Sequence, residues 1–341
     1  MKVLVLAGGD SGERDVSMNT GRAVVRSLQR LGHEVLAIDP SSGRSLLDSK
    51  GQFLVAAGNK STQESFPVDA SPRALANSLA AADYNDVEVV FIALHGGAGE
   101  NGTIQNLLQL AGKKYTGSGM AASAVAMDKA ISKRLMTSVG VPTPKWKLVI
   151  ITGDQDAARV SSEIAADFDL PVIVKPNDAG STIGLTKVTT PEGLASALKK
   201  AAVYGRKVLV EDYIAGREVT AAVFDGQSYP LVEIKPVSGL YDYEAKYTRG
   251  KSEYIAPAEV DEKIAGEVRA AAVKVFNVIG ASGLARIDFI LAPSGKFHCL
   301  ELNSLPGMTD LSLAPMALKC EGIDFDQLVT LIIESALKRD D

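Results

Sequence analysis

Short apolar runs separated by helical patterns occupy the first third of the chain. The segments KVLVLA at 2–7, EVLAID at 34–39 and VEVVFIAL at 87–94 are apolar runs of strand length. Between the first two, the spacing of apolar residues from Met18 to Leu31 indicates a helix. Strands that alternate with helices are typical of a parallel sheet, so we predict an α/β domain over residues 1–119.

A second unit is predicted in the middle of the chain. Apolar residues over Ala121–Val139 have helical spacing, and the prolines of the following VPTP segment end this predicted helix. The runs PVIVKP at 171–176 and KVLVEDYI at 207–214 are of strand length and flank a helical pattern at 191–203. Together they indicate a smaller α+β unit over residues 120–211.

The remaining residues, 212–341, form the third predicted unit. It begins with the strand VTAAVF, contains a helix from Asp261 to Ile279, and ends in two strands around the turn APSGK. A chain of 341 residues suits two or three domains, because single cores stop growing near about 250–300 residues. The Ser-, Gly- and Asp-rich segment 41–75 is expected to be an elaborated crossover on the first sheet, and it indicates no function.

Composition narrows the functional class. The 36 basic and 41 acidic residues give a net charge of -5, and no basic run is present, so a nucleic-acid surface is not expected. No apolar stretch approaches the roughly 20 residues that cross a bilayer, so we expect a cytoplasmic protein without a membrane segment. Cys299 and Cys320 do not form a C-x-x-C pair, and we expect both to be buried.

The last two predicted strands place four polar residues on one face. Pairing Ala292 with Phe297 across the turn sets Asp288 opposite Glu301 and Arg286 opposite Asn303. The opposite face would then hold the apolar residues Ile287, Phe289, Leu300 and Leu302. Two opposed carboxylates call for a cation between them, and oxygen ligands without His or Cys favour Mg²⁺ or Mn²⁺. A solvated polar face is the alternative for this hairpin taken alone.

A glycine-rich loop adds a possible phosphate site. Lys175 ends the strand PVIVKP, and the loop Asn177–Gly184 follows it, with glycines that allow backbone N–H groups to approach a phosphate. The Walker motif is absent, since Ala245 stands where its first glycine belongs before Gly250-Lys251-Ser252. The turn after the first strand, together with Asp39, imitates a dinucleotide fold, so a nicotinamide-dependent oxidoreductase stays as an alternative.

Taken together, these segments resemble the D-alanine:D-alanine ligase family of the ATP-grasp superfamily. The resemblance covers nearly the whole chain and implies an ATP-grasp fold, α/β and α+β, with an N-terminal Rossmann-like domain. The segments that carry it are GGDSGERDVS at 8–17, HGGAGENGTIQ at 95–105, YTGSGMAASAVAMDK at 115–129, VIVKPNDAGSTIG at 172–184, YDYEAKY at 241–247, GLARIDF at 283–289 and LELNSLPGMTDLSL at 300–313.

The resemblance implies that ATP is bound between the second and third domains. Lys129 and Lys175 would contact its phosphates. The other implied ATP-binding residues are Glu211, Tyr213, Ile214, Glu218 and Lys246. Asp288, Glu301 and Asn303 would hold two Mg²⁺ or Mn²⁺ ions, which agrees with the shared face of the hairpin.

It also implies the sites of two D-alanine molecules. Glu13 would bind the ammonium of the first, with His95 near its reacting carboxylate. Arg286 and the backbone N–H of Gly307 would stabilise the oxyanion formed when the second D-alanine attacks the D-alanyl phosphate. Ser312 and the Leu313 N–H would bind the second carboxylate, and a hydrogen-bond network would link Glu13, Ser17, Ser181 and Tyr247.

The segment YDYEAKY favours an amino acid as second substrate, and Tyr241–Ala256 would form a lid over the acyl phosphate. The chain departs from the family pattern at Asn101, at Asp15 and at Asn177-Asp-Ala, the last of which changes the charge at the phosphate loop. A D-serine-using ligase and a non-catalytic relative that binds ATP stay as alternatives. The resemblance also makes a homodimer the expected assembly.

Overall fold

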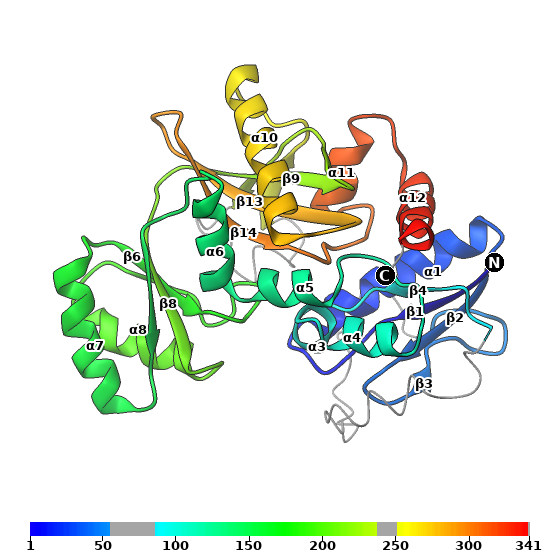
Figure 1. The fold of residues 1–341 in the computed structure, drawn as a ribbon, viewed down its shortest axis with the longest axis horizontal. Helices are drawn as coiled ribbons and strands as arrows, with labels where there is room; N and C mark the ends of the chain where they lie inside the picture. The colour runs from blue at the N-terminus through cyan, green and yellow to red at the C-terminus, as the bar shows by residue number, and fades with distance from the viewer. Residues whose placement is uncertain (55–85, 237–250, 340–341) are drawn as a thin grey trace.

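Three sheets arranged in a row make up the protein (Figure 1). The computed structural model describes residues 1–54, 86–236 and 251–339. Within that part of the chain no helix is both long and apolar enough to span a membrane. The first and third sheets fall inside their predicted ranges, and the central sheet extends one residue past its range because its last strand ends at Asp212. The boundaries between the predicted ranges stay a prediction.

The N-terminal sheet confirms the predicted α/β pattern. β1 (Lys2–Leu6) pairs in parallel with β2 (Glu34–Asp39) on one side and with β4 (Val89–Ile92) on the other. The short β3 (Arg44–Ser45) adds an antiparallel edge and gives the order β3-β2-β1-β4. The helices of this unit are α1 (Arg14–Arg30), α3 (Gly97–Glu100) and α4 (Thr103–Leu110).

The predicted helix over Ala121–Val139 is in fact two helices, α5 (Met120–Met127) and α6 (Lys129–Ser138). The break falls at Asp128, which has extended backbone angles and accepts a hydrogen bond from the Ile131 N–H, as an N-cap does. Continuous apolar spacing hid this break, because a cap is a local hydrogen-bonding feature. The break makes Lys129 the first residue of a new helix.

The central sheet is antiparallel, with the order β5-β8-β6-β7. Its elements are β5 (Trp146–Ile150), α7 (Asp154–Asp167), β6 (Val172–Pro176), β7 (Thr186–Val188), α8 (Gly193–Ala202) and β8 (Lys207–Asp212). Val172 and Val174 of β6, with Val208 and Val210 of β8, pack against α7 and α8 in one core. Alternation along these strands therefore turns the residues between them, among them Lys175 and Glu211, to the opposite face.

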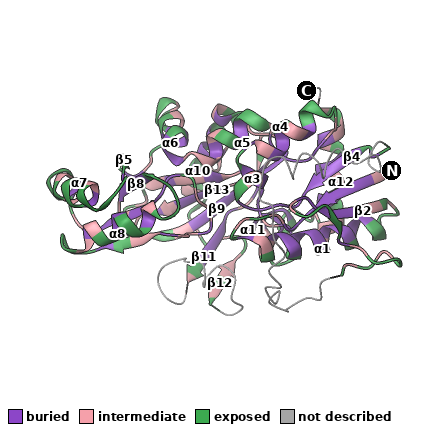
Figure 2. Ribbon diagram, turned by 90° about the horizontal axis from the view of Figure 1, so that it is seen from below, coloured by how far each residue is buried: buried purple, intermediate pink, exposed green. Residues whose placement is uncertain are grey.

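The third sheet has the order β12-β11-β9-β13-β14, with β10 beside β9. Its elements are β9 (Arg217–Phe224), β10 (Gln227–Ser228), β11 (Val232–Pro236), β12 (Ser252–Ile255), α10 (Glu262–Ile279), β13 (Leu284–Leu291), β14 (Phe297–Asn303) and α11 (Leu313–Lys319). Helices α5, α6 and α10 share a core with β9, β13 and β14. The buried strands and the exposed helix surfaces are separated clearly in Figure 2.

The C-terminal helix α12 (Phe325–Lys338) returns to the first unit and packs beside α1 (Figure 1). Asp326 of α12 pairs with Arg30 at 2.5 Å and accepts a hydrogen bond of 2.7 Å from Ser27. The predicted third range thus contains a helix whose apolar face belongs to the core of the first. That core joins the two ends of the chain.

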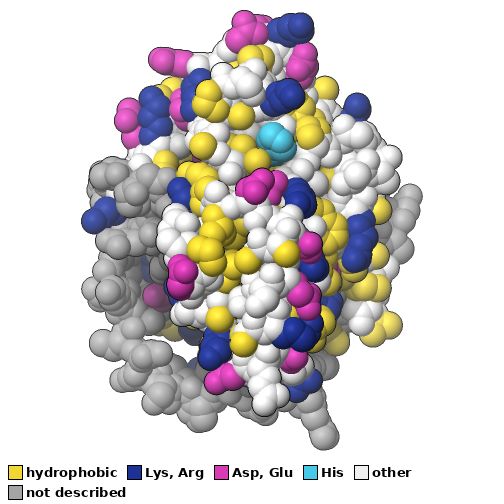
Figure 3. All heavy atoms as spheres, turned by 90° about the vertical axis from the view of Figure 1, so that its left-hand side faces the viewer, with side chains coloured by type: hydrophobic (Ala, Val, Ile, Leu, Met, Phe, Trp, Pro, Cys, Tyr) yellow, Lys and Arg dark blue, Asp and Glu magenta, His cyan; other side chains and the backbone are white. Residues whose placement is uncertain are grey.

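The surface has mixed charge on the face seen in Figure 3, the side that α7 and α8 occupy. Lys147 lies between Glu163 and Asp167, and Arg159 between Asp156 and Glu163.

One of the two cysteine predictions is wrong. Cys299 is buried in the third sheet, whereas Cys320 is exposed at the C-terminal end of α11, where helix geometry turns it outward.

Candidate active site

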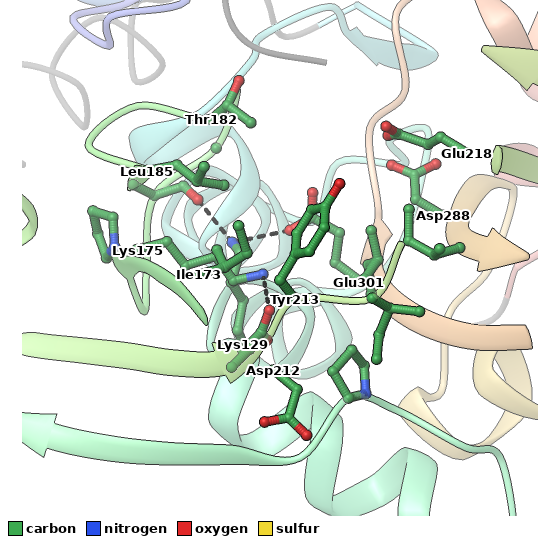
Figure 4. A pocket seen from close by; sticks show the side chains of 18 of the residues that line it. Lys129, Ile173, Lys175, Thr182, Leu185, Asp212, Tyr213, Glu218, Asp288 and Glu301 are labelled. Atoms are coloured by element: carbon green, nitrogen blue, oxygen red, sulfur yellow. Dashed lines mark hydrogen bonds and ion pairs between the residues drawn. The ribbon is translucent and has the colours of Figure 1, made fainter. Parts of the chain in front are cut away.

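A cavity lies between the central sheet and the third sheet. In Figure 4, Lys129 and Lys175 lie on one side of it and Glu218 and Asp288 on the other, with Tyr213 between them. Eight residues with a predicted ATP or metal role line this cavity, and they are Lys129, Lys175, Glu211, Tyr213, Ile214, Glu218, Asp288 and Glu301. Residues far apart in the chain are thus brought to one space.

The register predicted for the β13–β14 hairpin is confirmed where it matters. Asp288 pairs with Glu301 and Arg286 pairs with Asn303. Ile287, Phe289 and Leu302 are buried on the opposite face, where each fully buried side chain contributes about 1.5–3 kcal/mol. A slip of one residue would expose all three, so the core selects this register.

Near the turn the register prediction is wrong by one residue. Phe297 pairs with Leu291 rather than with Ala292, and the register shifts between Asp288 and Phe289. The extra residue on β14 is Leu300, which therefore lines the cavity instead of the core face. Cys299 takes the core position, fully buried.

Asp288 accepts hydrogen bonds from three side chains. Arg286 donates from Nε to Oδ1 and from Nη2 to Oδ2, each at 2.9 Å. The hydroxyl of Thr220, on the neighbouring strand β9, donates to Oδ1 at 2.7 Å, and Asn303 Nδ2 donates to Oδ2 at 3.1 Å. These contacts hold a 5 % exposed carboxylate in one orientation.

The two predicted phosphate lysines each pair with a carboxylate. Lys129 Nζ lies 3.2 Å from Glu301 Oε2 and donates to the Ala179 carbonyl at 2.7 Å. Lys175 Nζ lies 2.8 Å from Glu211 Oε2. Burial alone would lower the pKa of Lys175, but the charges of Glu211, Glu301 and Glu218 outweigh it and hold that pKa above its ordinary value.

The glycine-rich loop bends back over the cavity. Ser181 and Thr182 have positive φ values of 49° and 58°, and Ser181 donates a short hydrogen bond to Glu13. A Cβ atom at Gly180 would come within 2.7 Å of Glu13 Oε2, so a larger residue there would require the Glu13 carboxylate or the loop to shift. The contact joins the loop to the N-terminal unit, as expected for Glu13 and Ser181.

Asn177, one of the departures from the family pattern, is fully buried and caps α6. Its Oδ1 accepts from the Ala130 N–H at 2.9 Å, and its carbonyl accepts from the Lys129 N–H at 3.3 Å. Asn101, another departure, accepts through Oδ1 from the Thr103 N–H at 3.0 Å at the start of α4. Both amides supply the acceptor that a helix start requires, so neither departure leaves a helix uncapped.

Ser17 and His95 are the other predicted site residues of the first unit. Ser17 is fully buried, accepts from the Gly8 N–H at 2.8 Å and donates to the Ala93 carbonyl at 2.7 Å. His95 Nε2 lies 2.9 Å from the Thr20 hydroxyl. Ser17 thus stabilises the turn after β1. His95 belongs to a buried group with Thr20 and Glu100, which we call the His95 cluster.

Gly307, Ser312 and Leu313 lie together on the segment that leads into α11. The Ser312 hydroxyl accepts from the Thr309 N–H at 3.1 Å, and a Cβ atom at Gly307 would approach it to 3.0 Å. The Met308 N–H reaches the Thr20 hydroxyl at 3.4 Å and so ties this segment to the His95 cluster. Lys246, Tyr247 and residues 241–250 of the predicted lid lie outside the described residues.

Three contributors to the site were not predicted. Lys133 is fully buried, with Nζ 2.8 Å from Glu211 Oε1. Glu100 is buried with Oε1 3.8 Å from His95 Nδ1, and burial, together with the charge of Glu13, raises its pKa. Thr220 holds Asp288. Lys133 lies one turn after Lys129 and Glu100 lies inside the HGGAGE motif, which are the signals that could have found them.

Asp39, on which the dinucleotide alternative depended, is occupied elsewhere. Its Oδ2 lies 2.5 Å from Arg14 Nη2, and its Oδ1 accepts from the Gly9 N–H at 3.1 Å. The carboxylate therefore stabilises the glycine turn.

Two sheets that enclose a cavity lined by lysines, a glycine-rich loop and a carboxylate hairpin define an ATP-grasp protein. A family model described as the D-ala D-ala ligase N-terminus matches residues 2–118, and one described as the C-terminus matches residues 135–334. The chain belongs to the D-alanine–D-alanine ligase family.

Individual relatives agree over the full length. The D-alanine–D-alanine ligase of Syntrophotalea carbinolica is 41% identical over 339 residues, which are 99% of this chain and 97% of the relative. That of Magnetococcus marinus is 38% identical over 338 residues, covering 98% and 97%.

Solved structures give the same fold. The Bacillus anthracis D-alanine–D-alanine ligase complexed with ATP superposes with a TM-score of 0.77 at 26% identity, covering 99% of this chain and 98% of that one. The VanG D-Ala:D-Ser ligase of Enterococcus faecalis has a TM-score of 0.77 at 28% identity, covering 98% and 99%.

Proposed function

We propose that this chain joins two D-alanine molecules into D-alanyl-D-alanine through a D-alanyl phosphate, with ATP converted to ADP and phosphate, for peptidoglycan precursor synthesis. The observation that carries the proposal is the cavity in which Lys129, Lys175, Asp288 and Glu301 converge, in a chain of this family. The ATP complex of the Bacillus anthracis relative supports ATP as the nucleotide.

ATP binds in the cavity between the central and third sheets. Lys129 and Lys175 stabilise its phosphates, since both ammonium groups reach the cavity from the same side (Figure 4). Glu211, Tyr213, Ile214 and Glu218, which line the same space, surround adenine and ribose. Lys246, for which the resemblance also implies ATP binding, lies outside the described residues. The Nζ atom of Lys187 lies 3.5 Å from the centroid of the Tyr213 ring, and this cation–π contact orients the ring.

The donor set of the hairpin suits two Mg²⁺ or Mn²⁺ ions. Asp288 and Glu301 are directly opposed across two strands, and all their ligand atoms are hard oxygens. Asn303 donates to Asp288 through Nδ2, which leaves Oδ1 as the atom that would bind an ion. When bound, the ions supply charge neutralisation for the transferring phosphoryl group.

The first D-alanine is bound by its ammonium at Glu13, near His95. Its carboxylate oxygen attacks the γ-phosphorus, the bond to the β-phosphate oxygen breaks, and ADP leaves. The amine of the second D-alanine then attacks the carbonyl carbon and loses a proton, while Arg286 and the Gly307 N–H stabilise the oxyanion. Phosphate leaves with the former carboxylate oxygen, and the second carboxylate is bound by Ser312 and the Leu313 N–H.

Ser17, Ser181 and Tyr247 complete the hydrogen-bond network around Glu13. The short contact of Ser181 with Glu13 supports this part of the proposal, because it already joins the phosphate loop to the N-terminal unit. Closure of the loop and the lid excludes water from the acyl phosphate, which water would otherwise hydrolyse. We further propose a cytoplasmic homodimer.

The activity is tested by incubation with ATP, Mg²⁺ and D-alanine, with phosphate and dipeptide quantified together. We expect one phosphate per D-alanyl-D-alanine and no product from L-alanine. Addition of D-serine beside D-alanine tests the mixed product named for the Enterococcus faecalis relative. Nucleotide binding without any dipeptide would contradict the proposal in favour of a non-catalytic relative.

A further inference from the structure

A buried cluster of three charges lies at the wall of the nucleotide cavity. Glu211, on β8, is 2 % exposed and has one lysine at each carboxylate oxygen. Lys133 Nζ lies 2.8 Å from Oε1, and Lys175 Nζ lies 2.8 Å from Oε2. We call Lys133, Glu211 and Lys175 the buried triad.

The two lysines differ in their access to the cavity. Lys175 lines it, together with Glu211, at the start of the phosphate loop. Lys133 is fully buried, does not line it, and comes from α6, where it also donates to the Thr143 hydroxyl at 2.5 Å. One lysine can therefore exchange its partner for a ligand, and the other cannot.

A carboxylate buried this deeply must keep a positive partner to stay ionised and in place. Under the proposed function, Lys175 turns from Glu211 to the phosphates of ATP. At that moment Oε2 loses its cation, and only Lys133 at Oε1 still neutralises Glu211. If Lys175 were the only lysine beside Glu211, it would have to leave Glu211 unpaired in order to bind the phosphates.

We propose that Lys133 is a positioning residue that keeps Glu211 paired, so that Lys175 is free to bind the nucleotide phosphates. This inference rests on the proposed function, because it takes Lys175 as a phosphate ligand. The triad has one positive charge more than it has negative charges, which is the balance that an incoming polyphosphate complements. Lys133 acts through Glu211 and Lys175 and does not touch the ligand.

The direction of the pKa shift of Glu211 agrees with a carboxylate that neighbouring charges keep ionised. Burial alone would raise the pKa of Glu211, but Lys133 and Lys175 outweigh it, and that pKa lies below its ordinary value. Burial lowers the pKa of Lys133, and the like charge of Lys175 lowers it further against the attraction of Glu211. The two lysines therefore repel each other, which favours release of the one that can move.

The test measures binding of a non-hydrolysable ATP analogue with Mg²⁺ by calorimetry, and the KM for D-alanine separately. Lys133→Met should weaken analogue binding at least tenfold and change the KM for D-alanine less than twofold. Lys207→Met is the matched control, since Lys207 pairs with Asp128 at 2.9 Å and also links β8 to the start of α6. It should bind the analogue within twofold of wild type.

A double variant separates positioning from folding. With Glu211→Gln the triad has no carboxylate to neutralise, so adding Lys133→Met should change analogue affinity less than twofold. This comparison decides the matter even where Lys133→Met alone does not fold. A change of fivefold or more when Lys133→Met is added to the Glu211→Gln protein, or wild-type affinity in a folded Lys133→Met protein, would overturn the inference. A wild-type protein that binds no analogue would instead refute the proposed function.

Discussion

Two of the acidic groups that line the cavity, Asp288 and Glu211, are held by different means. Asp288 receives its hydrogen bonds from residues of its own hairpin and from the strand beside it, Arg286, Asn303 and Thr220. Glu211 is neutralised by lysines from two other elements, α6 and β6. The first arrangement follows from strand register, and the second exists only when α6, β6 and β8 pack together.

This difference indicates that the two ends of the cavity have different functions. Under the proposed function, the fixed carboxylate, the bidentate arginine and the amide at the hairpin end meet the charge that develops during the reaction. At the Glu211 end, one of two lysines lies on the cavity wall and the other lies behind it. We therefore expect changes in the hairpin to reduce turnover, and changes in the buried triad to reduce nucleotide binding.

The largest effect is expected for Asp288→Asn. The amide keeps the shape of the side chain but cannot bind a divalent cation with a full charge, so kcat should fall at least about a thousandfold, or about 4 kcal/mol. Phosphate release over a range of Mg²⁺ concentrations measures it, and excess Mg²⁺ should not restore activity. Analogue binding in EDTA is the control and should stay near wild type. Near-normal turnover would remove Asp288 from the proposed metal ligands.

Arg286→Lys should reduce kcat by about a hundredfold to a thousandfold. Lysine keeps the charge but not the planar fork that holds both oxygens of Asp288 and that would meet the oxyanion. Steady-state kinetics should show a smaller change in the KM for ATP than in kcat. If the KM for ATP rises while kcat is unchanged, the hairpin end binds nucleotide and the comparison above fails.

Gly180→Ala should reduce kcat/KM for D-alanine by about tenfold to a hundredfold, because the added methyl group meets Glu13 Oε2 at 2.7 Å and displaces the loop. Gly153→Ala is the matched control, since a Cβ atom there meets nothing within 4 Å and the backbone is extended. Kinetics with varied D-alanine compares the two variants. Equal activity of both would show that the loop tolerates separation from Glu13.

The smallest effect concerns stability at low pH. The pKa of Glu211 lies below its ordinary value of 4.5, so its contribution to folding is complete above pH 4.5 and is lost as the pH falls through the folded pKa. Glu211→Gln lacks this contribution, and its melting temperature should depend less on pH below 4.5. Thermal melts of both proteins between neutral pH and pH 3 measure it. If the melting temperatures of the two proteins depend on pH equally, Glu211 is not ionised in the folded protein.

The residues explain which features could be predicted from the sequence. The pairing of Asp288 with Glu301 depends on alternation and a short turn, and the alternation at the buried Ile287 and Leu302 selects the register. The bulge at Leu300 could not be predicted, because alternation assumes a regular strand. Asp128 broke a predicted helix for the same reason, since capping depends on one hydrogen bond and not on apolar spacing.

Long-range pairs were the other omission. The signal for Lys133, its place one helical turn after Lys129, is weak because a helical lysine is usually solvated, and its partner Glu211 comes from a strand far along the chain. The resemblance named Glu211 but not the cation that makes its burial possible. The folded structure was needed for that pair, and for the way Asn177 caps α6 from the phosphate loop.

The transfer of one carboxylate oxygen from D-alanine to phosphate is the most direct test of the proposed reaction. D-Alanine labelled with ¹⁸O in its carboxyl group is incubated with ATP, Mg²⁺ and the protein, and the phosphate released with the dipeptide is analysed by mass spectrometry. Attack of the carboxylate on the γ-phosphorus predicts one ¹⁸O atom in each phosphate. Unlabelled phosphate, or label in AMP, would contradict a D-alanyl phosphate and with it the proposed function of the hairpin.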